Sequence, residues 1–127
     1  MLLVEDNDLN MEIAQFVLES SGAVVTKAWN GREAVDAFAA SAPGSFDVIL
    51  MDVMMPVMGG LEAARTIRAM QRPDAALVPI FAMTANAFQD DIRRSRAAGM
   101  NEHLTKPLDA KEFLAAIARY RKQKENP

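Results

Sequence analysis

Three acidic side chains in this 127-residue sequence stand directly after apolar runs, at positions where carboxyl groups can do chemistry. Glu5 and Asp6 follow a first short run, and Asp52 follows the run 48–51. If these runs are neighbouring strands, the three carboxylates converge and raise one another's pKa unless a cation neutralises them. Mg²⁺ suits such a site because it prefers a few carboxylates, retained water and phosphate oxygens. We therefore expect Mg²⁺ to be held by Glu5, Asp6, Asp52 and the backbone carbonyl of Met54.

Two more polar side chains end apolar stretches and can act on a phosphoryl group. Lys106 offers an ammonium group that can reach a phosphoryl oxygen, and Thr84 offers a hydroxyl donor. Taken alone, a strand-end lysine is usually solvated and a strand threonine usually reflects β propensity, so both gain meaning only beside the acids. Together they predict phosphoryl transfer, with Asp52 as the nucleophile, Lys106 neutralising charge and Thr84 binding one oxygen. The product is an acyl phosphate.

A structural explanation competes for part of this set, because acids also cap helices. For Glu5 and Asp6 alone, capping explains the residues as well as metal binding does. Asp52 is different, since the Pro- and Gly-punctuated loop 54–60 follows it and no helix is expected to begin there. The set as a whole therefore favours a functional site, where perturbed carboxylates gather.

Alternating apolar and amphipathic stretches indicate the elements that place these side chains. Apolar runs predict strands at 2–4, 24–26, 46–51, 79–83 and 103–105. Helical stretches are predicted to start near Leu9, after Asn30, at Leu61, at Ala87 and after Asp109. Strands that alternate with helices predict a doubly wound α/β fold, with one parallel sheet covered on both faces.

Two of these helices carry more specific signals. In the first, apolar residues recur at helical spacing, namely Leu9, Ile13, Phe16 and Val17. In the last, Asp109 with Glu112 three residues further on has the pattern of a capping box. The patterns predict a helix in the first case and a capped helix start in the second.

The composition fits one globular domain, because half of the residues are hydrophobic and 24% are charged. We expect this domain at residues 1–121, followed by a tail at 122–127. There is no cysteine, no signal peptide and no apolar run near the roughly 20 residues that span a bilayer, so we expect a soluble, cytoplasmic chain without membrane insertion. The net charge of −3 argues against direct nucleic-acid binding, and Arg93, Arg94 and Arg96 fit a solvated helix face.

The motifs around these residues resemble the receiver domains of two-component response regulators, from residue 2 to about residue 119. The resemblance implies a flavodoxin-like five-stranded sheet in the order 2-1-3-4-5 with five helices. It makes Glu5 and Asp6 the acidic pair and Asp52 the phosphoacceptor. The wording of the motifs at 4–7, 82–87 and 98–101 is similar to receivers attached to hybrid sensor histidine kinases.

The resemblance also assigns features around the last strand. It implies a cis peptide between Lys106 and Pro107. His103 falls where the family carries an aromatic residue that turns inward as Thr84 moves toward the phosphoryl group. A role for His103 as metal ligand or catalytic base is not expected, because the family uses no histidine chemistry in this domain. Phosphorylation would then shift the surface of the fourth helix, fifth strand and fifth helix.

The implied partner carries a phosphohistidine and is a histidine kinase or a histidine phosphotransfer domain. The chain would catalyse its own phosphorylation and the hydrolysis that resets it, and a weak homodimer stays open. Only four residues precede Glu5, so the first strand is short for a strand inside the sheet. This short start suggests that residues of a longer protein are missing before it, and a stand-alone regulator and a fragment of a hybrid histidine kinase both stay open.

Three rival functions remain to be weighed. A phosphatase of the haloacid dehalogenase type carries a second aspartate two positions after its nucleophile, where this chain has Met54. A nucleotide- or flavin-binding protein needs glycines or hydroxyls after the first strand, and acids stand there instead. A degenerate receiver that binds partners without phosphorylation typically lacks an acid or the lysine, and both kinds of residue are present here.

Overall fold

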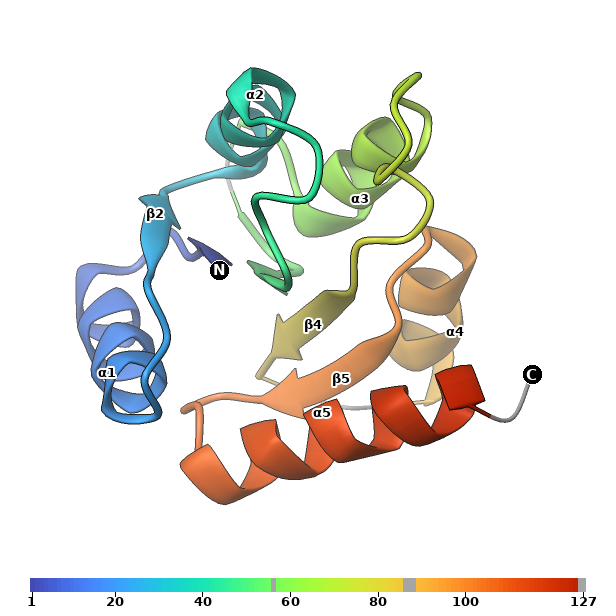
Figure 1. Cartoon of the computed structure of the whole chain (residues 1–127). Coiled ribbons are helices and arrows are strands. Elements are labelled where there is room, and N and C mark those ends of the chain that lie inside the picture. Colours follow the sequence, from blue (N-terminus) through green and yellow to red (C-terminus); the bar gives the residue numbers. More distant parts are fainter. Residues whose placement is uncertain (56, 86–88, 126–127) are drawn as a thin grey trace.

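The structure, a computed structural model, describes every residue except 56, 86–88 and 126–127. Within the described residues, five strands alternate with five helices along the chain (Figure 1). The strands are β1 (Leu2–Val4), β2 (Thr26–Ala28), β3 (Ile49–Asp52), β4 (Ile80–Thr84) and β5 (Glu102–Thr105). The helices are α1 (Asp8–Ser20), α2 (Gly31–Ala40), α3 (Gly60–Arg68), α4 (Gln89–Ala97) and α5 (Ala110–Glu125).

The strands form one parallel sheet in the order β2-β1-β3-β4-β5, which confirms the predicted fold and strand order. β1 lies beside β3, with Val4 opposite Met51. β3 lies beside β4, with Asp52 opposite Met83. Because all strands run in the same direction, their carboxyl ends meet at one edge of the sheet. The acids that follow β1 and end β3 therefore come together at that edge.

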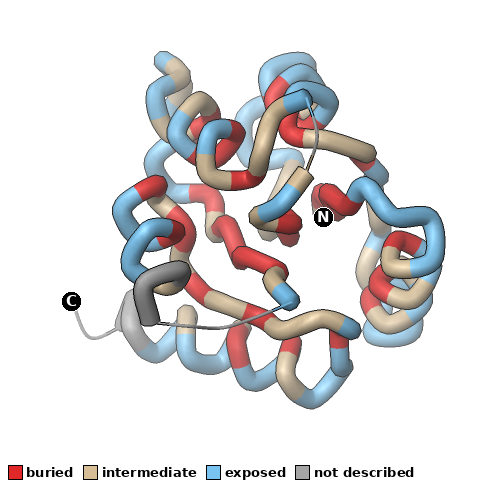
Figure 2. Tube along the Cα trace, turned by 180° about the vertical axis from the view of Figure 1, so that it is seen from behind, coloured by how far each residue is buried: buried red, intermediate tan, exposed pale blue. Residues whose placement is uncertain are grey.

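Helices cover both faces of the sheet, and each face buries its own apolar cluster (Figures 1 and 2). On one face, Phe38 of α2 and Ile67 of α3 belong to the cluster. On the other face, Leu18 of α1 and Phe113 of α5 do. Side chains of a strand alternate between the two faces, so a strand covered on both must be apolar throughout, as β1 is.

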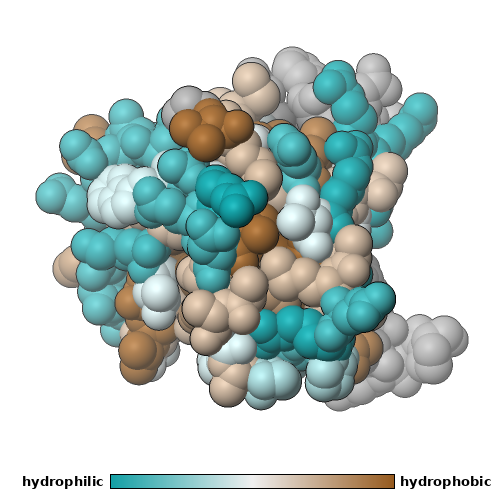
Figure 3. All heavy atoms as spheres, turned by 90° about the horizontal axis from the view of Figure 1, so that it is seen from above, coloured by the Kyte–Doolittle hydropathy of each residue, from teal (hydrophilic) through white to brown (hydrophobic). Residues whose placement is uncertain are grey.

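Polar and apolar side chains both reach the outer surface. On the face seen from above, hydrophilic groups surround small hydrophobic ones (Figure 3). Among the residues whose burial the structure describes, the exposed large apolar side chains are Leu9, Phe16, Val24, Met54, Val57, Leu77 and Leu114. None of the helices in the described residues combines the length and the apolar composition of a membrane-spanning segment.

Several predicted strand boundaries were wrong, and the second strand shows why. The prediction at 24–26 followed β-branched residues, whereas the observed strand is Thr26–Ala28 because Thr26 lies opposite Leu2, the first residue of β1. Val24 lies outside this pairing, and its side chain is 83% exposed. The other shifted strands are observed at 49–52, 80–84 and 102–105, so Asp52 and Thr84 are the last residues of their strands rather than the residues after them.

Helix α1 forms where its apolar spacing predicted a helix, but part of that apolar set faces solvent. Leu9 and Phe16 are 64% and 74% exposed. The buried positions of the helix are Met11, Ala14 and Leu18. Apolar residues occur on more than one side of this helix, so their spacing alone did not identify the side that packs on the sheet.

The later helices differ from the prediction at their ends. The predicted start of α4 at residue 87 lies outside the described residues. At the start of α5, Asp109 Oδ1 accepts the N–H of Lys111 at 3.0 Å, but Glu112 does not complete a capping box, because its Oε1 accepts the N–H of Thr105 at 3.0 Å. α5 continues to Glu125, so residues 122–125, which we expected in a tail, are helical. The last two residues of that tail lie outside the described part.

Candidate functional site

The carboxyl ends of β1 and β3 bring the three predicted acids together. Glu5, directly after β1, is 1% exposed, and Asp52, at the end of β3, is 2% exposed. Asp6 is exposed to solvent. One carboxylate oxygen from each of the three residues lies within 4.8 Å of the others. Three oxygen donors this close together, two of them buried, are suited to hold a hard divalent cation.

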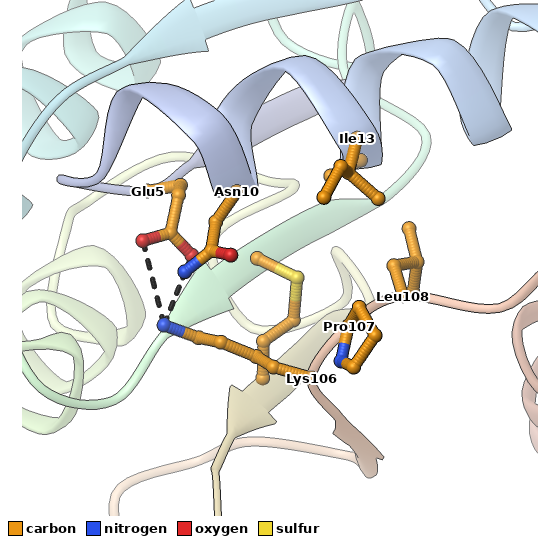
Figure 4. Close-up of a pocket in the computed structure, with 8 residues that line it drawn as sticks. Glu5, Asn10, Ile13, Lys106, Pro107 and Leu108 are labelled. Atoms are coloured by element: carbon orange, nitrogen blue, oxygen red, sulfur yellow. Dashed lines mark hydrogen bonds and ion pairs between the residues drawn. The ribbon is translucent and has the colours of Figure 1, made fainter.

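Lys106 reaches the two buried acids from the end of β5. Its Nζ is 2.6 Å from Asp52 Oδ2 and 3.0 Å from Glu5 Oε2. Figure 4 shows the lysine side chain extended toward Glu5, beneath the first turns of α1. The backbone N–H of Lys106 donates to the carbonyl of Thr84 at 2.9 Å, which anchors the lysine beside the end of β4. The peptide bond between Lys106 and Pro107 is cis.

Two buried carboxylates, those of Glu5 and Asp52, share the ammonium group of Lys106, and burial is the main cause of their shifted pKa values. Burial raises the pKa of Asp52, and the hydrogen bond from Lys106 offsets only part of that rise. Burial likewise raises the pKa of Glu5 against the bond from Lys106, and the charge of Asp52 raises it further. Burial alone would lower the pKa of Lys106, but its bonds to both carboxylates raise it. The lysine is held charged, whereas the carboxylates are under-neutralised and would gain from a further cation.

The loop after Asp52 shapes the site from one side. The backbone N–H of Met54 donates to Asp52 Oδ1 at 3.2 Å, which orients the carboxylate. The N–H of Gly60 donates to the carbonyl of Val53 at 3.0 Å and closes the loop where α3 begins. A Cβ on Gly60 would overlap the carbonyl oxygen of Asp52, so a glycine is needed at that position. The metal-binding role predicted for the carbonyl of Met54 stays a prediction.

Thr84 and His103 lie on the neighbouring strands β4 and β5, where Thr84 is opposite Thr105 and His103 is opposite Ala82. Thr84 ends β4 and stands one residue beyond Met83, which is the partner of Asp52 in β3. His103 belongs to β5, and its Nε2 contacts the hydroxyl of Ser95 on α4. The structure therefore brings the threonine to the edge where the acids lie, and it ties the half-buried histidine to α4.

We predict that His103 titrates below the ordinary range of a histidine. Burial lowers its pKa, the positive charge of Arg96 lowers it further, and the negative charge of Glu102 opposes both. His103 is the single histidine of the sequence, so its ring protons can be followed by NMR without overlap. Arg96→Ala should raise the midpoint toward about 6.5, and the exposed Arg93→Ala should leave it in place. Equal midpoints in the Arg96 variant and the wild type would refute the charge effect.

Three residues near the site carried no role in the sequence prediction. Ser95 contacts His103 from a polar stretch that has no distinctive pattern. Asn10 lines the small cavity drawn in Figure 4, and its amide lies beside the ends of Glu5 and Lys106. Gly31 begins α2, and glycine is a poor helix former. The unusual residue type at the start of a helix was the one signal in the sequence that could have drawn attention to this position.

Comparison with known proteins agrees with this fold. A family profile for the response regulator receiver domain matches residues 1–118. The chain is 32% identical to the polar-differentiation response regulator DivK of Brucella anthropi, over 94% of each chain. Among solved structures, the receiver domain of the sensor histidine kinase PA1611 from Pseudomonas aeruginosa PAO1 is 39% identical, with a TM-score of 0.82, over 94% of this chain and 93% of that one. That structure has a magnesium ion coordinated in its active site cleft.

The chain belongs to the receiver domains of two-component response regulators, which confirms the resemblance seen in its motifs. Its relatives also include histidine kinases that contain such a domain. It is 36% identical to the probable histidine kinase 2 of Oryza sativa subsp. indica, over 92% of this chain. The chain spans only 12% of the length of that kinase. It is thus a two-component signalling domain, homologous to the receivers of hybrid kinases.

Proposed function

We propose that the chain accepts a phosphoryl group on Asp52 from a phosphohistidine, with Mg²⁺ as the required cofactor. Glu5, Asp6 and Asp52 would hold the ion through their carboxylates, together with the backbone carbonyl of Met54. The proposal is carried by one observation: three carboxylates converge within 4.8 Å, and the Nζ of Lys106 lies 2.6 Å from Asp52. The carboxylates are under-neutralised without a second cation, so the residues present fit a divalent ion.

In the proposed transfer, an oxygen of Asp52 attacks the phosphorus while the bond from phosphorus to the donor imidazole nitrogen breaks. The imidazole leaves with the electron pair of that bond and takes a proton from water. Lys106, which pairs with Asp52 before transfer, neutralises charge on the phosphoryl oxygens, and Thr84 donates its hydroxyl to one of them. Bound Mg²⁺ would supply further positive charge to the same oxygens.

The proposed donor is a histidine kinase or a histidine phosphotransfer domain that docks beside α1. Its phosphohistidine must reach Asp52, so the donor must cover the surface next to the site. Leu9 and Phe16 are 64% and 74% exposed on α1. Ile13 lies between them in sequence and lines the cavity that Lys106 also lines (Figure 4). Apolar side chains on a helix beside the site suit a partner that presents its own helix.

The proposed response is a shift between two conformations. The new phosphoryl oxygens would draw Thr84 toward Asp52 and leave room for His103 to turn inward. His103 would then give up its contact with Ser95 on α4. The surface of α4, β5 and α5 would change as a result. Attack by water on the acyl phosphate would release inorganic phosphate and restore the carboxylate of Asp52.

Phosphorylation itself provides the test. Incubation with Mg²⁺ and a small acyl-phosphate donor such as acetyl phosphate should add one phosphoryl group, as measured by intact mass. Borohydride reduction of the acyl phosphate followed by peptide mapping should locate the group at Asp52. Excess chelator should prevent the labelling. A label on another residue, or equal labelling without divalent metal, would contradict the proposal.

A further inference from the structure

The loop 53–59 beside the metal site is held by a second element, the start of α2. The N–H of Gly31 donates to the carbonyl of Met58 at 2.9 Å. A Cβ added at Gly31 would overlap that oxygen and lie 3.0 Å from the carbonyl oxygen of Gly59. Both oxygens belong to the backbone and cannot rotate away as a side chain could. We propose that Gly31 is a positioning residue for the metal site, an inference that rests on the proposed function.

The donor side of this contact is fixed by the cap of α2. Asn30 Oδ1 accepts the N–H of Glu33 at 2.9 Å, and Glu33 Oε1 accepts the N–H of Trp29 at 3.1 Å. The first bond occupies one of the N–H groups that a helix start leaves without internal partners, and the second ties the residue before the cap to the first turn of the helix. The N–H of Gly31 is another such group, and it is directed at the loop. The carbonyl of Met58 therefore accepts an N–H that the helix start would otherwise leave without a partner. In return, the helix start fixes the position of the loop.

The loop needs an external anchor because part of its backbone is strained. Val57 has a φ of +68°, a left-handed conformation that is unfavourable for a β-branched residue. Its side chain is 84% exposed, so packing of that side chain does not explain the conformation. Strained backbone persists only where surrounding contacts impose it. The carbonyl held by Gly31 belongs to Met58, the residue directly after Val57.

The anchored loop is also the loop that shapes the metal site. It starts directly after Asp52, and the bond from Gly60 to the Val53 carbonyl joins its two ends, so that its described residues 53–55 and 57–59 form one unit. Met54 lies in that unit, donates its N–H to Asp52 Oδ1, and supplies the carbonyl proposed as a metal ligand. A shift of the Met58 carbonyl away from α2 would therefore move Met54 relative to the carboxylates.

The test measures metal affinity, with Mn²⁺ as the probe and the EPR signal of free Mn²⁺ as the readout. Gly31→Ala should weaken Mn²⁺ binding about tenfold, as expected for a residue that orients metal ligands. Arg32→Ala is the matched control, because it changes the next residue of α2, whose side chain is 62% exposed and pairs with Asp36 of the same helix. Ile117→Ala, half-buried in the cluster on the opposite face, controls for lost stability. Both controls should bind Mn²⁺ as the wild type does.

The possible results of the Mn²⁺ measurement distinguish the positioning role of Gly31 from the metal site itself. Wild-type affinity in Gly31→Ala would overturn the positioning role while leaving the proposed function intact. Absence of Mn²⁺ binding by the wild type would overturn the metal site and this inference with it. Equal weakening in Ile117→Ala and Gly31→Ala would show a general stability effect and also overturn the inference.

A measurement on the wild type keeps the proposal testable even if Gly31→Ala does not fold. Amide hydrogen exchange should show the N–H of Gly31 protected, and protection should increase when Mg²⁺ binds, because the loop and the metal stabilise each other. Exchange of this N–H at the rate of an open loop, with and without Mg²⁺, would overturn the positioning role.

Discussion

Asp52→Asn is expected to abolish phosphorylation and, at the same time, to make the metal-free fold more stable. The loss of phosphorylation follows because an amide does not replace the carboxylate nucleophile. The gain in stability follows because burial raises the pKa of Asp52, so keeping this carboxylate ionised at pH 7 costs free energy. Asparagine removes the charge with little change in shape, and Lys106 keeps its ion pair with Glu5. Functional sites commonly hold such destabilising groups.

Unfolding by urea in the presence of EDTA at pH 7 measures this gain, which we expect to be about 1–2 kcal/mol. The wild type should lose stability as pH rises from 3.8, the ordinary pKa of Asp52, through its raised pKa in the folded state. In this window the folded chain binds more protons than the unfolded chain. In Asp52→Asn, the free energy of unfolding should fall less over the same range of pH. Asp36→Asn, which removes a carboxylate that is 62% exposed, is the control and should change little.

A lower stability of Asp52→Asn than of the wild type, under these metal-free conditions, would reverse the interpretation. It would mean that the attraction between Asp52 and Lys106 outweighs the cost of burying the carboxylate. Addition of Mg²⁺ should change the order of the two proteins, because only the wild type offers all three carboxylates to the ion. Stabilisation by a ligand grows with its concentration relative to its dissociation constant.

The position of the site was predictable because its residues end apolar stretches. Asp52, Thr84 and Lys106 each stand where such a stretch stops, and a parallel sheet gathers those ends at one edge. The strand order needed more than periodicity, since the apolar runs do not reveal which strands are neighbours. The order came from the family resemblance of the motifs. The boundaries were less predictable, because the extent of β2 depends on its pairing with Leu2 and not on its own β-branched residues.

Contacts between distant segments left no periodic signal. Glu112 has the spacing of a capping box, but its carboxylate is used by Thr105 of the neighbouring strand. The bond from Gly31 to the carbonyl of Met58 involves only backbone atoms, which any residue type has. The only trace of that contact in the sequence is the glycine itself, because the contact excludes any residue with a Cβ at that position. Local sequence patterns were therefore enough to locate the site. The contacts that hold its loop in place became visible only in the structure.

Lys106→Met is expected to have the opposite effect on stability to Asp52→Asn. It removes the ammonium group that lies 2.6 Å from Asp52 and 3.0 Å from Glu5, whose side chains are each 2% exposed. Removing one partner of a buried ion pair leaves charge without compensation, and we expect a loss of about 3 kcal/mol at pH 7 in EDTA. Phosphorylation should fall as well, because charge on the phosphoryl oxygens loses a neutralising group.

Recovery of the lost stability distinguishes charge from packing. The pKa values of both carboxylates should rise further without Lys106, so lowering the pH toward 4 should restore much of the stability of Lys106→Met. Mg²⁺ should restore part of it at pH 7, because the ion replaces the missing positive charge. Lys111→Met, which removes an exposed lysine, should show neither the loss nor the recovery.

The double variant Asp52→Asn with Lys106→Met completes the argument as a thermodynamic cycle. If the cost of removing Lys106 comes from the uncompensated charge of Asp52, the double variant should be clearly more stable than Lys106→Met alone. Glu5 would remain as the one buried carboxylate of the pair, so part of the cost should persist. Additive effects, with Asp52→Asn contributing the same change in both backgrounds, would mean that the two side chains are not energetically coupled despite their contact. Urea unfolding of the four proteins in EDTA measures the coupling directly.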